Sequence, residues 1–293
     1  MSYFLSILSG ACISLLILIN GWLANAIGVY QASIIFNMAA FLFILLICII
    51  NREKFKSYKI PWYMYLGGIA YVCTVLFNNL AFGKISVSSI LATSLLGQAL
   101  ISAVIDHFGL FNMPKVQFKP TKIIAYVIVL LGILTLLLPI KSDAYFAIFV
   151  SLLTGFFVIA ARVINAEYSR HESEQLSTLV NYLIGVIGIV IISKVFYNVS
   201  AIDTIKKAHL VNPLLFLGGA FGVATITINN YVTHKISSYY LTLFLFIGQV
   251  FSGILVDIAI DGVFSLRNLV GGMFVLCGLI LNIYIDNKNT KLS

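Results

Sequence analysis

Charged residues are scarce in this chain. Asp, Glu, Lys and Arg together make up 10% of its 293 residues, against about 25% in a typical soluble domain. Hydrophobic residues make up 61%, and the mean hydropathy is +1.05. A soluble globular domain is therefore excluded, and an integral membrane protein is expected.

The chain also lacks the motifs of common metal, disulfide and nucleotide sites. Its four cysteines stand singly in apolar segments, at positions Cys12, Cys48, Cys73 and Cys277. Neither a disulfide framework nor a zinc site is therefore expected. No Gly-x-x-x-x-Gly-Lys loop is present, which argues against ATP as an energy source within the chain. The histidines form no metal-ligand or nucleophile motif, so we expect no metal, no cofactor and no enzymatic activity.

The net charge of +8 does not indicate a nucleic-acid partner, which would need a basic soluble surface. Lys and Arg instead flank the apolar runs, where they would lie beside anionic lipid headgroups. The loops on one side of the expected membrane hold more of them than the loops on the other. By the positive-inside rule that side is cytoplasmic, so both termini are expected inside the cell.

Ten apolar runs of about twenty residues are present, the length that a helix needs to cross a ~30 Å hydrocarbon core. Their expected limits are 4–24, 31–50, 62–83, 87–106, 122–140, 144–166, 176–197, 213–233, 238–259 and 267–286. Continuous apolar stretches such as 41–50 exclude a β-barrel, whose strands alternate at period two. The expected fold is all-α, a polytopic membrane protein with ten transmembrane helices.

Polar residues of the first half return in the second half at a constant spacing. The first copy contains Leu66-Gly67-Gly68, Asn78-Asn79, Lys84-Ile85-Ser86, Gly97-Gln98 and Asp106. The second contains Leu217-Gly218-Gly219, Asn229-Asn230, Lys235-Ile236-Ser237, Gly248-Gln249 and Asp257, each 151 residues later. A constant spacing is the signature of a duplicated unit. Because each copy has five spans, we expect residues 1–141 and 142–293 to form two inverted repeats.

Polar residues inside the spans are candidates for a solute pathway, because a lone polar group in hydrocarbon is costly. Gln98 and Gln249 each lie about 18 Å into their span, so inverted symmetry would bring them together near the midplane. The expected pathway residues are Asn20, Trp22, Asn78, Asn79, Gln98, Arg162, Asn165, Glu167, Asn229, Asn230 and Gln249. The alternative role for each amide is hydrogen bonding between helices, worth ~0.6 kcal/mol.

Two groups of charged residues lie close to the spans. Arg162 lies one turn inside its apolar stretch and needs a partner or a water-filled cavity. Glu167 does not fit the helical spacing of three or four residues from Arg162, so another helix is expected to supply a partner for Arg162. The functional role considered for these residues is contact with a substrate or an ion. The alternative is a structural ion pair or a position at the membrane interface. The candidates for proton coupling are Asp106, His107, Glu167 and Asp257. Interfacial solvation is the simpler role for the Asp106-His107 pair.

The tract Gly97-Gln98, followed by Ile105-Asp106-His107-Phe108-Gly109-Leu110-Phe111, resembles the YdcZ-type branch of the drug/metabolite transporter superfamily. Small members of that branch are five-helix units that pair in opposite orientations, and longer members fuse two units. The resemblance covers nearly the whole chain as two copies, although His107 and Phe108-Gly109 have no match in the second. It implies a ten-helix carrier for small metabolites, with a central site lined by helices one, three, four, six, eight and nine.

We therefore expect a secondary transporter in the cytoplasmic (inner) membrane. It would export a small metabolite, drug-like or cationic solute by alternating access, with proton coupling as a hypothesis. Trp22, Tyr71 and Phe77 are candidates to line a pocket for an organic cation. The alternatives are an uptake carrier of the same fold and a non-transporting scaffold. The expected partners are the solute and the lipid bilayer, and the functional unit is a monomer or a homodimer.

Overall fold

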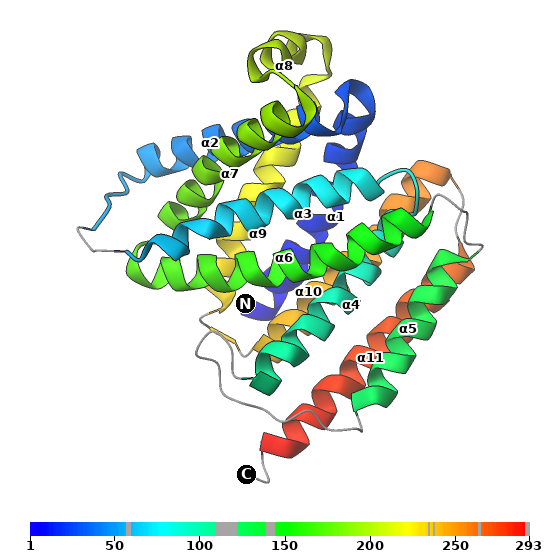
Figure 1. The fold of residues 1–293 in the computed structure, drawn as a ribbon. Coiled ribbons are helices and arrows are strands. Elements are labelled where there is room, and N and C mark those ends of the chain that lie inside the picture. Colours follow the sequence, from blue (N-terminus) through cyan, green and yellow to red (C-terminus); the bar gives the residue numbers. More distant parts are fainter. Residues whose placement is uncertain are drawn as a thin grey trace.

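The computed structural model describes residues 1–56, 60–108, 122–138, 144–233, 235–236, 238–262 and 265–290, and all regular structure within these ranges is helical. The long helices are α1 (Ser2–Ile27), α2 (Val29–Ile50), α3 (Gly67–Ala81), α4 (Val87–Phe108), α5 (Lys122–Leu137), α6 (Ala144–His171), α7 (Glu174–Tyr197), α9 (Leu217–Thr233), α10 (Ser238–Asp261) and α11 (Leu266–Thr290). Each predicted run therefore contains a helix (Figure 1). Short 3-10 turns, Trp62–Leu66 and Pro213–Phe216, lead into α3 and α9.

Seven helical segments of the described chain are long and apolar enough to cross a membrane. They contain α1, α2, α3, α6, α7, α9 and α10, whereas α4, α5 and α11 carry shorter apolar stretches within the described residues. Large apolar side chains are exposed on the outer helices, where lipid would cover them: Leu42, Leu46, Leu130, Leu134, Ile187, Ile191, Met273 and Ile280. The chain is an all-helical, multi-pass membrane protein.

The helix ends follow from residues that cannot continue a helix or that cap one. Gly28, the single residue between α1 and α2, has a φ of 99°, which glycine adopts without the strain of a Cβ. Ser173 caps α7 by accepting a hydrogen bond from the backbone N–H of Leu176. Asn198 ends α7 in the left-handed conformation. The sequence did not predict the short helix that follows, α8 (Ala201–Lys207), which Ser200 caps.

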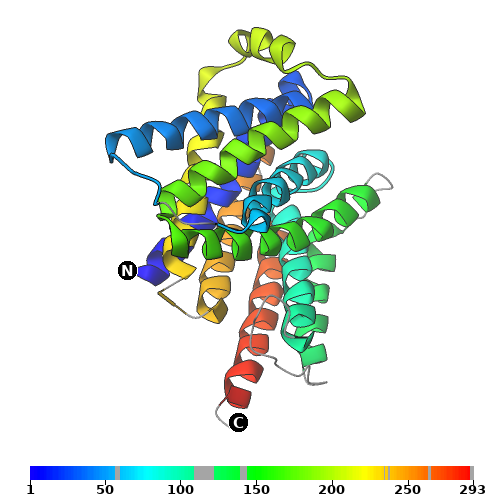
Figure 2. The ribbon, with the colours of Figure 1, turned by 60° about the vertical axis from the view of Figure 1, so that its left-hand side comes forward.

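The helices pack in matched pairs from the two halves of the chain. α1 packs on α9 and α10, while α6 packs on α3 and α4; α2 packs on α9, while α7 packs on α3. The remaining main pairs join equivalent helices directly: α2 with α7, α4 with α10, and α5 with α11. Both views show α5 and α11 side by side at one edge of the molecule (Figures 1 and 2). Each of these pairs therefore either has an equivalent pair formed by the corresponding helices of the other half, or joins two corresponding helices to each other.

Glycines allow two equivalent crossings between the halves. α4 meets α6 at Gly97 and Gly155, and a Cβ on Gly155 would collide with backbone atoms of α4. α1 meets α10 at Gly10 and Gly248, where a Cβ on either glycine would collide with backbone of the other helix. Small residues let membrane helices approach this closely. These crossings join α1 to α10 and α4 to α6, and α4 in turn packs on α10.

Candidate functional site

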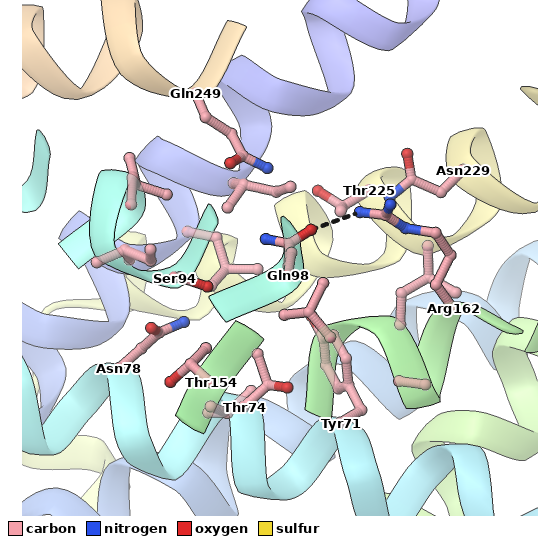
Figure 3. Close-up of a pocket in the computed structure, with 18 of the residues that line it drawn as sticks. Tyr71, Thr74, Asn78, Ser94, Gln98, Thr154, Arg162, Thr225, Asn229 and Gln249 are labelled. Carbon is pink, nitrogen blue, oxygen red and sulfur yellow. Dashed lines mark hydrogen bonds between the residues drawn. The ribbon is translucent and has the colours of Figure 1, made fainter. Parts of the chain in front are cut away.

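A cavity of about 90 Å³ lies between α1, α3, α4, α6, α9 and α10. Figure 3 shows the side chains that line it. The polar lining residues are Tyr71, Thr74, Asn78, Ser94, Gln98, Thr154, Arg162, Asn165, Thr225, Asn229, Asn230 and Gln249. The apolar ones are Ile13, Leu16, Ile17, Val75, Leu91, Val158, Ala161 and Ile226. In chain order these six helices are the first, third, fourth, sixth, eighth and ninth long helices, the set that the family resemblance implies.

Equivalent positions of the two halves build opposite parts of this wall. On α1 and α6 the pairs are 145 residues apart: Ile13 with Val158, Leu16 with Ala161, and Ile17 with Arg162. On the other four helices they are 151 apart: Thr74 with Thr225, Val75 with Ile226, Asn78 with Asn229, and Gln98 with Gln249. Most pairs match in polarity. The pair of Ile17 and Arg162 does not, so the cavity carries its charge on one side.

Arg162 is the only charged residue among the described residues that line the cavity. Its guanidinium donates a hydrogen bond from Nη2 to Oε1 of Gln98, at 3.1 Å. Within the described residues no carboxylate lies at ion-pair distance from it. The sequence predicted that another helix would supply a partner, and α4 does so, but with an amide. Among the described residues, the charge of Arg162 next to the cavity therefore has no counter-charge.

The two ends of the cavity differ in their hydrogen bonds. The hydroxyl of Ser9 on α1 donates to Oδ1 of Asn229 on α9, at 2.9 Å. The equivalent residues of the other half are Thr154 and Asn78. The Thr154 hydroxyl instead bonds to the Val150 carbonyl of its own helix, at 2.9 Å, and Oδ1 of Asn78 has no partner among the described residues. One end is thus tied across two helices, and the equivalent contact at the other end is not made.

A second set of asparagines shows the same difference. Nδ2 of Asn20 donates to Oδ1 of Asn79 at 2.9 Å, joining α1 to α3. The equivalent residues are Asn165 and Asn230, yet Asn165 donates to Oδ1 of Asn181 on α7, at 2.9 Å. Nδ2 of Asn230 has no partner among the described residues. Identical residues at equivalent positions therefore hold different partners in the two halves.

Four of the predicted pathway residues do not line the cavity. Asn20 and Asn79 are buried outside the lining, and Nδ2 of Asn20 donates to Oδ1 of Asn79. Trp22 is 46% exposed. Glu167 forms an ion pair with Arg170, at 2.9 Å, on an exposed part of α6. The other seven predicted residues do line the cavity: Asn78, Gln98, Arg162, Asn165, Asn229, Asn230 and Gln249.

The three aromatic residues considered for a cation pocket lie apart. Tyr71 lines the cavity, but its hydroxyl accepts a hydrogen bond from the Tyr182 hydroxyl, at 3.2 Å. Phe77 packs on Phe157, with ring centroids 5.6 Å apart, and Trp22 is not in the wall. The structure therefore does not gather these rings into one site.

The proton-coupling candidates have different surroundings. Asp257, on α10, is buried and accepts hydrogen bonds from the backbone N–H groups of Val87 and Ser88, at 2.7 and 3.1 Å. These groups are the first of α4, so the carboxylate stabilises the positive end of that helix dipole. Asp106 and His107 lie in the last turn of α4, and their side chains are outside the described part of the structure.

The sequence did not single out the serine and threonine hydroxyls of the cavity lining, which are those of Thr74, Ser94, Thr154 and Thr225, or that of Ser9, which bonds to the lining residue Asn229. Ser and Thr in membrane helices often bond to their own backbone, so they carry little signal alone. The spacing could have identified Ser9 and Thr154, because they precede the matched Gly10 and Gly155 at the same distance of 145 residues.

A multi-pass helical protein that encloses a polar cavity between its helices has the architecture of a membrane transporter. Comparisons with known proteins narrow this class. The model of a family described as "Putative inner membrane exporter, YdcZ" matches residues 1–135 and again residues 146–281. The chain belongs to this family, which confirms the resemblance read from the sequence and its two-copy form. It is thus an inner-membrane protein of an exporter family in the drug/metabolite transporter superfamily.

Several solved structures have a related fold, and one of them is a crystal structure. It superimposes with a TM-score of 0.59 at 13% sequence identity, covering 94% of this chain and 97% of that chain. At this identity the likeness shows the fold alone. A search of curated proteins returned no match.

Proposed function

We propose that this protein is a secondary transporter, with its ten long helices forming two inverted five-helix repeats. It would move a small solute through the central cavity by alternating access, as a monomer or a homodimer with both termini in the cytoplasm. The observation that carries the proposal is the central cavity, whose opposite walls come from equivalent positions but whose ends are hydrogen-bonded differently.

Inverted repeats provide a simple route to alternating access, because the two halves can exchange conformations. In this structure Ser9 and Asn229 tie one end of the cavity. In the exchanged state we expect Thr154 and Asn78 to tie the opposite end, while Ser9 and Asn229 separate. Positive-inside topology assigns the Ser9 end to the cytoplasm. The present structure would then be the state whose cytoplasmic end is closed.

The proposal also includes the coupling of solute transport to protons. Glu167 pairs with Arg170 on the exposed face of α6, and Asp257 caps α4, so both carboxylates already have structural partners. Asp106 and His107 are then the first pair to test. Solute flux in liposomes should respond to an imposed pH gradient, and flux that ignores the gradient would remove proton coupling.

Alternating access is tested by locking one end of the cavity. In a variant without Cys12, Cys48, Cys73 and Cys277, the pair Ser9→Cys and Asn229→Cys is bridged by oxidation or by a short bifunctional thiol reagent. A reporter, Thr74→Cys, is then labelled with a membrane-impermeant reagent from each side of oriented vesicles. Bridging should block labelling from the cytoplasmic side and increase it from the opposite side.

The matched control is Glu167→Cys with Arg170→Cys, an exposed pair on one helix whose bridge joins no two helices. It should leave the labelling unchanged. Labelling that does not depend on the Ser9 to Asn229 bridge would contradict alternating access and favour a scaffold. The result needs no knowledge of the solute.

A further inference from the structure

We propose that the solute is a small carboxylate-bearing molecule, and that Arg162 binds its carboxylate. This rests on the proposed transport function and gives its substrate class. It replaces the cationic solute that the sequence suggested, because a cation would meet the positive charge of Arg162 and no acidic residue among the described lining of the cavity.

The guanidinium of Arg162 has unused capacity for an anion. It carries five N–H donors in a planar fork that matches a carboxylate, and one hydrogen bond, to Gln98, occupies it among the described residues. A buried charge without a counter-charge is costly in a membrane protein. A carboxylate in the cavity would supply both the missing charge and acceptors for the free donors.

Two further groups of the cavity lining are buried and have no hydrogen-bond partner among the described residues. The Thr225 hydroxyl and Nδ2 of Asn230 have no partner among the described residues, and the two residues are 5% and 3% exposed. Both are on α9 and line the cavity. Figure 3 shows Thr225 and Asn229 next to the end of the Arg162 side chain. The guanidinium of Arg162 and the nearby Thr225 hydroxyl suit the two oxygens of a carboxylate, and the Asn230 amide is a further free donor in the same lining.

The opposite side of the cavity offers an acceptor. Oδ1 of Asn78 is buried and has no partner among the described residues, and Figure 3 shows Asn78 across the cavity from Arg162. It could accept a hydrogen bond from a hydroxyl or ammonium group on the same solute. The remaining wall at Ile13, Leu16 and Ile17 is apolar. The arrangement fits a short hydroxy acid or amino acid.

The size of the cavity agrees with a compact solute. Its volume is about 90 Å³, and roughly 10 to 15 Å³ of such space holds one water. Several waters or one small carboxylate therefore fit. Drug-sized ligands occupy pockets of roughly 300 Å³ or more, so they would need a wider state of the cavity.

Binding to the full-length, detergent-solubilised protein tests the proposal through thermal unfolding with matched pairs of probes. The pairs are lactate with lactamide and alanine with alaninamide, in each of which an amide replaces the carboxylate. Sodium chloride at equal ionic strength controls for salt. Lactate, alanine or both should raise the melting temperature with increasing concentration by mass action, and the amides should not.

Variants of Arg162 test whether the binding of the carboxylate depends on this residue. R162Q should weaken carboxylate binding by about tenfold or more, since it removes the charged partner. R162K should bind more weakly than the parent but better than R162Q, because it keeps the charge and loses the fork. R170Q, at an exposed arginine of the same helix, should bind as the parent does.

The outcomes separate the two proposals. Equal stabilisation by acids and amides, no stabilisation by either acid, or unchanged binding in R162Q overturns the carboxylate assignment. If this occurs while the Ser9 to Asn229 bridge still controls reporter labelling, transport stands and the substrate class is wrong. If acids bind through Arg162 but the bridge has no effect, the carboxylate assignment stands and alternating access is wrong.

Discussion

The α1 and α6 walls of the cavity occupy equivalent positions in the two halves and differ in chemistry. Ile17 faces the cavity from α1, whereas its equivalent on α6 is Arg162. The glycine crossings behind them, Gly10 with Gly248 and Gly155 with Gly97, are nearly identical. The two halves thus share the features that bring helices together, and they differ where a solute would be recognised.

The two ends of the cavity differ in the opposite sense. Ser9 and Thr154 have the same hydroxyl chemistry, and both potential partners are asparagines, Asn229 and Asn78. Only the first pair is hydrogen-bonded. Since the chemistry is alike, the difference arises from how the helices are placed. Under the proposed function, differences in the walls would concern solute specificity, and differences at the ends would concern conformational state.

The largest loss of stability is expected at the glycine crossings, where the two halves are most alike. Gly10→Ala and Gly155→Ala should each lower the free energy of unfolding by about 1–3 kcal/mol, because the new methyl group would meet backbone of the facing helix, which cannot move aside. Thermal unfolding of the purified protein measures this. The control is Gly188→Ala, where the methyl would meet only the flexible end of the Ile69 side chain. A clear stabilisation in either crossing would show that the two contacts are not equivalent.

The next prediction exchanges the side chains at two equivalent wall positions, Arg162 and Ile17. R162I should weaken lactate or alanine binding by about 30-fold, or about 2 kcal/mol. Adding Ile17→Arg to this variant should recover part of the affinity, because Gln249 is equivalent to the Gln98 that bonds to Arg162. Ligand-dependent melting measures both. A double variant that binds no better than R162I would mean that the rest of the α6 wall, and not the charge alone, defines the site.

A smaller effect separates the two central amides. Gln98→Leu removes the hydrogen bond to Arg162, and hydrogen bonds between membrane helices contribute up to about 1.7 kcal/mol. Gln249→Leu should cost less, since the bond to Ser14 at 2.8 Å uses the backbone carbonyl of Gln249 and survives the change. Carboxylate affinity and melting temperature should fall more in the first variant. Equal losses would argue that both amides serve the solute equally.

The smallest effect compares the two ends. Ser9→Ala removes a hydrogen bond worth about 1 kcal/mol, so labelling of Thr74→Cys from the cytoplasm should rise by about fivefold. Thr154→Val removes only a bond within its own helix in the present state, but in the exchanged state it removes the proposed bond to Asn78, so labelling from the cytoplasm should fall by about fivefold. Changes in the same direction in the two variants would show that the Ser9 contact does not hold its end closed.

Much of the helical framework could be predicted from the sequence because its signals are local. A run of apolar residues is recognisable without knowledge of its neighbours, and helices lie in all ten predicted ranges. Their ends were less predictable: α6 continues to His171, five residues past the predicted limit. α8 was missed because seven residues capped by Ser200 are too short for a periodic signal.

The candidate site was predictable in its amides and much less so in its contacts. Gln98 and Asn78 stood out because a polar residue in a span needs a partner. The partner of Arg162 is 64 positions away in the chain, and no spacing rule reaches that far. The position of Trp22 outside the cavity lining could not be predicted for a related reason. The rotation of a helix about its axis decides whether a residue faces lipid or protein, and it depends on the helices that pack against that helix.

The sequence by itself determined that the chain lies in a membrane and that its second half repeats the first, since hydropathy and spacing are properties of the chain alone. Only the tertiary structure decided which of the equivalent residues pair, and which keep a buried group without a partner among the described residues. Asn79 and Asn230 are asparagines at equivalent positions. Asn79 bonds to Asn20, whereas Asn165, the equivalent of Asn20, bonds elsewhere, and Nδ2 of Asn230 has no partner among the described residues. The physical reason is that a hydrogen bond forms over about 3 Å, so small shifts between otherwise equivalent helices make or break it.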